Sequence, residues 1–274
     1  MEMDTIVSRN PASGSVLREL QQTPVEIIPD LVAQAREAQK AWALVPAKER
    51  AKVLLNAREY LLNNLDSIAD LISEENGKPK FEALANDLIP CLEVLTIFSK
   101  RGPKILKDRA LPLRWTVHRK SYLQYWPKGV VGIISPWNYP FSIPFGEIAM
   151  ALLAGNAVMF KPSEITPLAG LKIAEIFDHA CLPKGLLTVI IGGGAHGAAI
   201  IKAKVNAVCF TGSVATGKKV MAAAAEFLTP VTLELGGKDP MIVLPDADLD
   251  YATSAALWGG FSKSGQTCAS VERI

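Results

Sequence analysis

Residues 129–162, "GVVGIISPWNYPFSIPFGEIAMALLAGNAVMFKP", decide the fold. Two short apolar runs, at 130–135 and 157–162, enclose a stretch at 146–155 whose composition is that of an apolar helix. Continuous apolar strands joined by a helix are typical of a parallel sheet that is covered on both faces. These residues therefore predict a strand–helix–strand unit.

The same alternation continues toward residue 237. Further strands are expected at 186–193, 206–212 and 231–237, and helices at 167–180, 196–203 and 214–227. This pattern indicates the α/β class, with a doubly wound parallel, Rossmann-like sheet. Residues 239–270 begin another strand and helix, and the chain ends within that unit.

The first hundred residues are expected to be helical. Amphipathic patterns cover 29–45, 47–65 and 66–76, and the last of these begins with Asp66 as its cap and ends at Gly77. A further long helix is expected from about 80 to 100, ending near Gly102 and Pro103. Residues 113–127 alternate and are rich in Trp, Val and Tyr, which predicts one or two exposed strands.

The composition argues against several classes of partner. The 29 basic and 27 acidic residues leave a net charge of +2, which gives no electrostatic reason to expect nucleic acid or an anionic membrane. The N-terminus lacks the pattern of a signal peptide, and the apolar runs are too short to span a bilayer. Four scattered cysteines without a CxxC are typical of a reduced, cytoplasmic protein, and the three histidines lack metal-ligand spacing, so no metal is expected.

Four polar turns follow predicted strands. The carboxyl ends of parallel strands deliver the functional residues of such sheets. Each turn alone is most simply a turn, but four on consecutive strand ends indicate a ligand site. They are Ser135-Pro136-Trp137-Asn138, Lys161-Pro162-Ser163-Glu164, Thr211-Gly212-Ser213 and Glu234-Leu235-Gly236-Gly237.

Two glycine-containing turns are candidate phosphate sites. "GGGAHG" (192–197) matches G-x-G-x-x-G, but it occurs late in the α/β region, and no acidic residue ends a following strand some twenty residues on. "FTGSVATGKK" (210–219) is the better anion site, because Gly212 and Ser213 lead directly into a helix whose free N–H groups favour phosphate.

Cys268 is the candidate nucleophile. Small polar residues precede it in "GFSKSGQTCASVERI" (260–274), whereas Cys91, Cys181 and Cys209 lie in apolar settings typical of core cysteines. A thiol needs activation at neutral pH, and no His lies nearby in the sequence. Glu234, at the end of an apolar strand, is the candidate base, because burial there would raise its pKa toward neutrality. The alternative is that Glu234 is a strand-edge residue that points to solvent.

Taken together, these segments resemble the NAD(P)-dependent aldehyde dehydrogenase superfamily, over essentially the whole chain. "LELGGK" followed by "GQTC" is a highly specific combination. The motifs that carry the resemblance are "NPASG" (10–14), "ENGKP" (75–79), "PWNYP" (136–140), "KPSE" (161–164), "FTGSVATG" (210–217), "LELGGK" (233–238) and "GQTC" (265–268).

The resemblance implies three catalytic residues. Cys268 is expected to attack the aldehyde carbon, and Asn138, with the backbone N–H of Cys268, to hold the oxyanion. After hydride transfer to the nicotinamide, Glu234 is expected to activate the water that hydrolyses the thioester. Relatives that acylate coenzyme A typically lack this Glu, so its presence indicates hydrolysis to a carboxylic acid.

The resemblance also implies a cofactor site. Lys161 and Glu164 are expected to bind the adenosine ribose, and Ser213 the pyrophosphate, while Trp137 shapes the channel. Glu164 favours NAD, although NADP is possible, since a carboxylate repels a 2′-phosphate. The expected cofactor-binding residues are Ser135, Pro136, Trp137, Lys161, Ser163, Glu164, Gly194, Gly212, Ser213, Gly217, Leu235 and Gly236.

The implied organisation has four parts: 1–108, the helical part of the NAD-binding domain; 109–127, a strand arm for oligomerisation; 128–236, the Rossmann-like NAD-binding core; and 237–274, the start of a second α/β catalytic domain. Family members continue well past the Cys, so the chain is expected to be a fragment of a homodimeric or homotetrameric protein. Two alternatives are a non-catalytic dinucleotide-binding remnant and a cofactor-independent thiol esterase.

Overall fold

The computed structural model describes residues 5–115 and 118–274, and it is built around a five-stranded parallel sheet. The strands are β5 (Val130–Ile134), β6 (Ala157–Lys161), β7 (Leu187–Val189), β8 (Ala207–Gly212) and β9 (Val231–Leu235). Their order is β7-β6-β5-β8-β9, so the chain moves outward from β5 first on one side and then on the other. The predicted doubly wound sheet is confirmed, and the reversal of strand order lies between β5 and β8.

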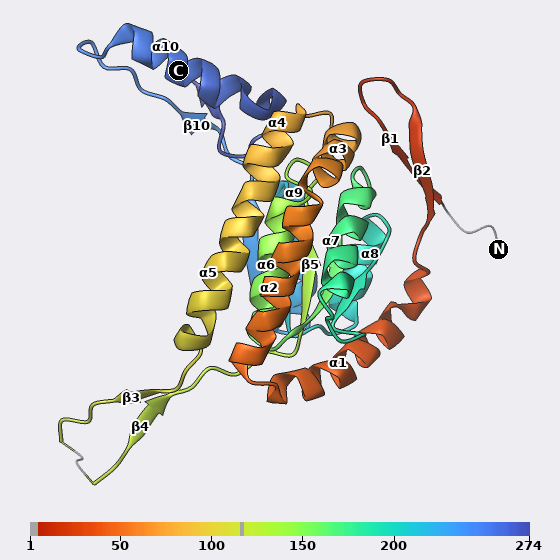
Figure 1. Ribbon diagram of the computed structural model, residues 1–274, viewed down its shortest axis with the longest axis vertical. Helices are drawn as coiled ribbons and strands as arrows, with labels where there is room; N and C mark the ends of the chain where they lie inside the picture. Colours follow the sequence, from red (N-terminus) through yellow and green to blue (C-terminus); the bar gives the residue numbers. More distant parts are fainter. Residues whose placement is uncertain (1–4, 116–117) are drawn as a thin grey trace.

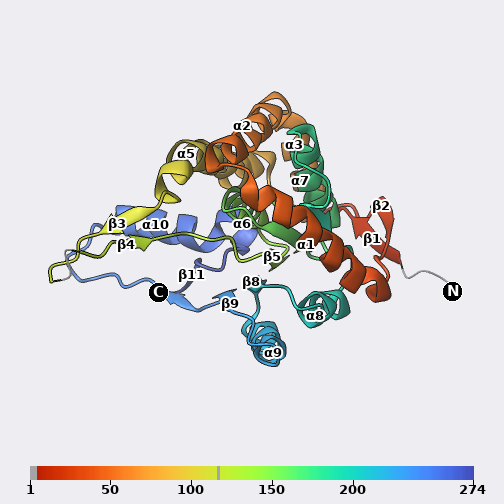
Figure 2. The ribbon, with the colours of Figure 1, turned by 90° about the horizontal axis from the view of Figure 1, so that it is seen from below.

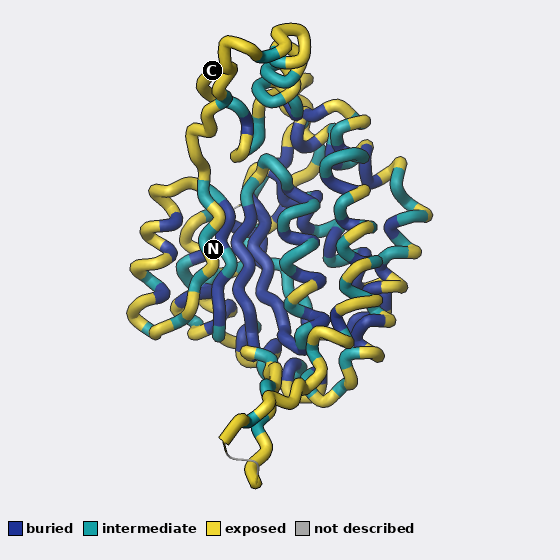
Figure 3. Tube along the Cα trace, turned by 90° about the vertical axis from the view of Figure 1, so that its left-hand side faces the viewer, coloured by how far each residue is buried: buried dark blue, intermediate teal, exposed yellow. Residues whose placement is uncertain are grey.

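Helices cover both faces of this sheet. α6 (Ser142–Leu153) and α7 (Pro167–His179) lie on one face, and α8 (Gly194–Lys202) and α9 (Val214–Ala225) on the other (Figure 2). Every residue of β5 and β6 is buried, and these strands form the dark centre of Figure 3. Burial on both faces explains why the two strands are continuously apolar in sequence.

The N-terminal region supplies an outer layer of helices (Figure 1). α2 (Ala47–Asn63), α3 (Leu65–Asn76) and α5 (Ile89–Ile105) pack outside α6 and α7, while α1 (Ile28–Leu44) packs against β5, β6, β7 and α8. The predicted end of α3 at Gly77 is confirmed, since Gly77 adopts a left-handed conformation with φ of 83°. The predicted cap is wrong, because the N-cap is Asn64 and Asp66 lies in the first turn.

The prediction that the first hundred residues are wholly helical is wrong at the start. β1 (Thr5–Arg9) and β2 (Val16–Gln21) form an antiparallel hairpin, and a single 3₁₀ turn (Val25–Ile27) precedes α1. The Asn10 side chain accepts hydrogen bonds from the N–H groups of Ala12 and Ser13, and Gly14 has a φ of 73°. These are the local devices of a tight turn, so this segment reverses direction rather than coiling.

The helix predicted for 80–100 is interrupted and longer than expected. α4 (Lys80–Glu82) leads into a π-helical segment, Ala83–Leu88, and then into α5. The Ile89 N–H bonds to the Leu84 carbonyl, five residues back, directly before Pro90, which has no N–H to offer. α5 passes through Gly102, where a Cβ would lie 2.3 Å from Leu153, so glycine lets α5 approach α6 closely.

Two extensions leave the body. β3 (Arg109–Leu111) and β4 (Ser121–Leu123) pair in an exposed antiparallel arm, with Trp115 and Trp126 exposed. β4 confirms a strand within 113–127, whereas β3 lies before the predicted segment, and residues 116–117 lie outside the described residues. Beyond the sheet lie β10 (Asp239–Pro240), α10 (Leu249–Phe261), a 3₁₀ turn (Ser262–Gly265) and β11 (Val271–Arg273), which pairs with β10 (Figure 1). Within the described part of the chain, no helix is both long and apolar enough to cross a membrane.

Candidate active site

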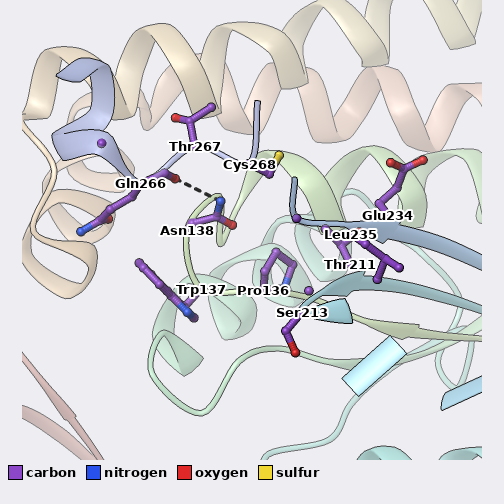
Figure 4. Close-up of a pocket in the computed structure, with 13 residues that line it drawn as sticks. Pro136, Trp137, Asn138, Thr211, Ser213, Glu234, Leu235, Gln266, Thr267 and Cys268 are labelled. Carbon is purple, nitrogen blue, oxygen red and sulfur yellow. Dashed lines mark hydrogen bonds between the residues drawn. The ribbon is translucent and has the colours of Figure 1, made fainter. Parts of the chain in front are cut away.

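A cavity of about 420 Å³ opens at the carboxyl edge of β5, β8 and β9 (Figure 4). Three of the four predicted polar turns line it, those after β5, β8 and β9, and the loop that carries Cys268 completes it. The lining residues are Pro136, Trp137, Asn138, Thr211, Gly212, Ser213, Glu234, Leu235, Gly236, Gly265, Gln266, Thr267 and Cys268. Parallel strands thus gather at one edge residues that are distant in sequence.

Cys268 lies on a sharply turned loop after α10. Lys263, Ser264 and Gly265 have φ values of 58°, 56° and 71°, three successive left-handed residues. The Gln266 N–H closes this turn on the Lys263 carbonyl at 3.0 Å. Cys268 is a free, exposed cysteine, and in Figure 4 its thiol is seen between the Asn138 amide and the Glu234 carboxylate. A thiol held on a constrained loop is suited to nucleophilic attack.

The loop after β5 is bonded directly to the Cys268 loop. Asn138 Nδ2 donates to the Gln266 carbonyl at 3.0 Å, and the Tyr139 hydroxyl lies 3.0 Å from Thr267 Oγ1. The Tyr139 N–H donates to Asn138 Oδ1 at 3.0 Å, which orients the amide with its Nδ2 toward the Cys268 loop. A donor is therefore held against the segment that delivers the thiol.

Glu234 stands on β9, opposite Thr211 of β8 in the parallel register. The expectation that Glu234 is buried is wrong, because its residue is exposed. Among the described strands β9 stands at the edge of the sheet, and none of them covers its outer side. The residue nevertheless lines the same cavity as Cys268.

Glu147, in α6, is a second carboxyl beside Glu234, and the sequence analysis did not find it. Burial, and then the charge of Glu234, raise the pKa of Glu147 to about 7. Its Oε2 atom is buried without a hydrogen-bond partner among the described residues. Burial and the charge of Glu147 also raise the pKa of Cys209, on β8, to about 11. Cys209 and Glu234 lie on the face of the sheet that α6 covers, so Glu147 faces both.

The stability of the protein should depend on the pH through Glu147. Between pH 4.5 and 7 the folded state keeps a proton that the unfolded chain releases, so stability falls as the pH rises. At about 1.4 kcal/mol per pKa unit, ionised Glu147 costs the folded protein about 3 kcal/mol above pH 7, and nothing below pH 4.5. Glu147→Gln should therefore gain stability relative to the parent protein as the pH rises from 5 to 8.

Urea unfolding of the full-length protein at both pH values measures this difference. Glu37→Gln is the control, because the Glu37 side chain is 71% exposed and pairs only with Lys40 among the described residues. A Glu147→Gln difference that is the same at pH 5 and pH 8 would contradict the assignment.

Of the predicted ribose residues, Lys161 is the last residue of β6 and Glu164 follows that strand, and both lie outside the cavity lining. Lys161 Nζ is 3.1 Å from Glu164 Oε2 and donates to the Pro162 carbonyl at 2.8 Å. Burial lowers the pKa of Lys161, although Glu164 opposes this. Burial alone would raise the pKa of Glu164, but its backbone hydrogen bond and Lys161 outweigh burial and lower it. Glu164 is therefore ionised at neutral pH, with its side chain 52% exposed.

The N-terminus of α9 lies at the edge of the cavity. Ser213 caps the helix by accepting from the Thr216 N–H, while the first N–H groups, of Val214 and Ala215, have no carbonyl within the helix to bind. Gly212 and Gly236 line the cavity, and a Cβ on Gly236 would meet no atom within 4 Å. The residues present therefore fit a dinucleotide, whose pyrophosphate the free N–H groups would hold.

Three other predicted cofactor residues make local contacts with neighbouring elements. A Cβ on Gly217 would lie 2.7 Å from Leu235, so glycine lets α9 approach β9. Ser163 Oγ accepts from the Ile165 N–H, and the Ser135 N–H donates to the Lys161 carbonyl. These contacts order the strand-end turns on which the lining residues stand.

The His196 ring packs against Gly192 within the "GGGAHG" loop. A Cβ on Gly192 would lie only 2.2 Å from this ring, and His196 Nε2 is 2.8 Å from the Thr23 carbonyl oxygen. Gly194 begins α8 and does not line the cavity. In the described part of the chain, no three His, Cys, Asp or Glu residues are grouped to hold a metal ion.

A buried charged cluster, which no sequence motif indicated, contacts the Asn138 carbonyl through Lys78. Lys78 and Asp87 form an ion pair with both side chains fully buried. Lys263, from the Cys268 loop, is buried next to them, and its Nζ atom has no hydrogen-bond partner among the described residues. Burial lowers the pKa of Lys263 to about 5, a drop that Lys78 adds to and Asp87 opposes. Burial thus disfavours the charged form of Lys263.

The geometry defines a class: a Rossmann-like α/β protein with a thiol, an amide and a carboxylate around one cavity. The sequence model of the aldehyde dehydrogenase family matches residues 1–274. The chain belongs to this family.

Individual relatives agree with this assignment. The chain is 42% identical over 275 residues to 4,4'-diapolycopene aldehyde oxidase from Methylomonas sp, covering 99% of this chain and 52% of that protein. Aldehyde dehydrogenase from Brucella melitensis biovar abortus 2308 superposes with a TM-score of 0.93 at 31% identity, over 98% of this chain and 55% of that one. The NAD+ complex of aldehyde dehydrogenase from Bacillus cereus superposes with a TM-score of 0.91 at 34% identity, over 97% of this chain and 55% of that one. The chain thus spans about half the length of these relatives.

Proposed function

We propose that this chain belongs to an NAD-dependent enzyme that oxidises an aldehyde to a carboxylic acid. The observation that carries the proposal is the convergence of Asn138, Glu234 and Cys268 on one cavity, beside a helix N-terminus suited to a pyrophosphate. The family membership supports it. The neighbour from Bacillus cereus that was solved with NAD+ supports the choice of cofactor.

The first half of the proposed reaction joins the substrate to Cys268. The thiolate attacks the carbonyl carbon, a C–S bond forms, and the carbonyl π electrons move to oxygen. Asn138 Nδ2 and the Cys268 backbone N–H stabilise that oxyanion, because preorganised donors act most strongly where charge develops. Nicotinamide, when bound, would accept the hydride that leaves the carbon of this adduct. Collapse of the oxyanion then leaves a thioester on Cys268.

The second half releases the product through Glu234. Its carboxylate takes a proton from a water molecule, whose oxygen attacks the thioester carbon. The C–S bond breaks, the Cys268 thiolate re-forms, and a carboxylic acid leaves. Glu234 is exposed to the cavity, so water has access to it. The presence of this carboxylate favours hydrolysis over transfer of the acyl group to coenzyme A.

We propose NAD rather than NADP as the better cofactor. The ionised, half-exposed Glu164 would repel a 2′-phosphate and accept hydrogen bonds from a 2′-hydroxyl. Lys161, held in place by Glu164 and the Pro162 carbonyl, would face the same ribose. The kcat/KM values for NAD+ and NADP+ compare the two cofactors directly.

The test of the function is aldehyde-dependent reduction of NAD+ by the full-length protein. A panel of short aliphatic, aromatic and long apolar aldehydes should include 4,4'-diapolycopene aldehyde, since the name of the relative from Methylomonas specifies it. We expect NADH and carboxylic acid in equal amounts, with no oxygen uptake. Oxygen consumption without NADH would contradict the proposal, and cofactor-independent ester hydrolysis alone would indicate a thiol esterase.

We further propose a cytoplasmic homo-oligomer. The exposed arm, β3 and β4, carries Tyr122, Tyr125 and Trp126 on its surface, and exposed aromatic side chains are common at subunit contacts. All four cysteines are free, as in a reducing compartment. The division into 1–108, 109–127, 128–236 and 237–274 remains our proposal for the domain organisation.

A further inference from the structure

We infer that Asn76 and Lys78 are positioning residues, which hold the oxyanion donor Asn138 in place through its backbone. The inference rests on the proposed function, because it assigns to Asn138 the role given there. It starts from the turn that joins α3 to α4, which the mechanism above does not use.

The two side chains bind consecutive carbonyls of the loop after β5. Asn76 Nδ2 donates to the Trp137 carbonyl at 2.7 Å, and Lys78 Nζ donates to the Asn138 carbonyl at 3.3 Å. Both donors are buried, Asn76 at 6% exposure and Lys78 at 1%. The peptide units on either side of the Asn138 Cα are thus fixed from one direction, which leaves the amide little freedom except rotation of its own side chain.

The turn that carries these donors is itself constrained. Gly77, between them, has a φ of 83°, and its N–H donates to the Ser73 carbonyl at 2.9 Å. Ser73 Oγ donates to the Lys78 carbonyl at 2.6 Å. A glycine in the left-handed region lets residues 76 and 78 point to the same loop, so the donors are fixed before any substrate binds.

Asp87 anchors the far end of the same loop. Its carboxylate pairs with Lys78 through Oδ2, while Oδ1 accepts from the N–H and the hydroxyl of Ser142, each at 3.1 Å. Asp87 lies in the π-helical segment Ala83–Leu88, the irregularity that sequence analysis did not predict. One short stretch of chain, 76–87, therefore holds both ends of the loop that carries Asn138.

This arrangement explains why a buried ion pair lies beneath the cavity. A displacement of about 1 Å at a catalytic group can lower the rate about 100-fold, so fixing the Asn138 backbone has a direct kinetic value. Lys78 is also 5.4 Å from the centre of the Tyr139 ring, and the Tyr139 hydroxyl contacts Thr267 of the Cys268 loop. The contacts of Asn76, Lys78 and Asp87 therefore hold Asn138 in place. Through Tyr139 they also act on the Cys268 loop.

Asn76→Ala in the full-length protein tests the inference, with Gln39→Ala as the matched control. Gln39 is also buried, at 8% exposure, and its amide donates one hydrogen bond, at 2.9 Å, to the Gly155 carbonyl at the opposite edge of the sheet. Each variant removes one neutral buried hydrogen bond, so both should lose similar stability. Only Asn76→Ala should lower kcat and the rate of the NADH burst, by about tenfold, with KM within about twofold of the parent value.

A double-mutant cycle with Asn138→Ala separates positioning from general damage. Asn76→Ala should cost nothing further once Asn138 is Ala, because the group that it positions is gone. The double variant Lys78→Met with Asp87→Leu is an independent test, because it removes both charges of the buried pair together. It should show the same loss of kcat and the same coupling to Asn138.

The outcomes distinguish this inference from the proposed function. An active parent protein in which Asn76→Ala and Gln39→Ala have equal kcat values would overturn the positioning role alone. A loss from Asn76→Ala that persists undiminished in the Asn138→Ala background would do the same. A parent protein that forms no NADH with any aldehyde would overturn the proposed function, and this inference with it.

Discussion

Replacing Cys268 by Ala is expected to abolish aldehyde oxidation by the full-length protein, lowering kcat by at least about 10⁴-fold. The reason is chemical: no other described cysteine lines the cavity, and without the thiol no covalent adduct forms from which hydride can leave. Cys268→Ser is a second variant of nearly the same size, and its weaker nucleophile should leave activity almost as low. NADH formation under saturating aldehyde and NAD+ measures both.

Cys209→Ala is the matched control for this experiment. Cys209 is largely buried on β8, with its pKa raised to about 11, so it is a protonated packing residue at neutral pH. Its removal should change kcat less than about twofold, because it does not touch the substrate. Residual turnover in Cys268→Ala comparable to that of Cys209→Ala would refute Cys268 as the nucleophile.

The second large effect is expected from Glu234→Gln, which should slow steady-state turnover by about 10²–10⁴-fold through loss of the general base. The attack by Cys268 and the hydride step do not use this carboxylate. A burst of about one NADH per active site should therefore persist, followed by slow hydrolysis of the thioester on Cys268. Stopped-flow absorbance resolves the two phases, and mass spectrometry of the quenched protein detects the acyl group on Cys268.

A slower burst in Glu234→Gln would place Glu234 before thioester formation, for example as the base that deprotonates Cys268. Glu147→Gln provides the comparison, because it removes the neighbouring carboxyl from α6 while leaving Glu234 in the cavity. Fast deacylation in Glu234→Gln would contradict the proposed role outright.

The central sheet could be predicted from sequence because its determinants are local. Residues 130–134 and 157–161 are buried on both faces, so 130–134 and 157–160 form continuous apolar runs, the second followed by Lys161. The site residues at the strand ends were predictable for a related reason, since the turns after β5, β8 and β9 must meet at one edge. The motifs of the family then assigned a role to each residue.

Other features depend on contacts that no local pattern records. The β1–β2 hairpin was missed although Asn10 and Gly14 are typical turn residues, because amphipathic helices dominate the sequence that follows. Asp87, in the π-helical segment, contacts Lys78 and Ser142, and the sequence pattern does not show either contact. Glu147 could not be recognised as titratable near neutral pH, because its burial and its nearness to Glu234 arise only when α6 packs on the sheet.

The hydrogen bond between Asn138 and Gln266 has a consequence for how the molecule assembles. It joins groups that are 128 residues apart in sequence, whereas the bond between Gly129 and Asn156 at the start of β5 and β6 spans only 27. Closing a longer loop costs more chain entropy, and short-range contacts generally form earlier in folding. We therefore expect the sheet and its strand-end turns to form first. Cys268 should come into place beside Asn138 among the last steps, so that the sheet edge that lines the cavity is complete before the thiol reaches it.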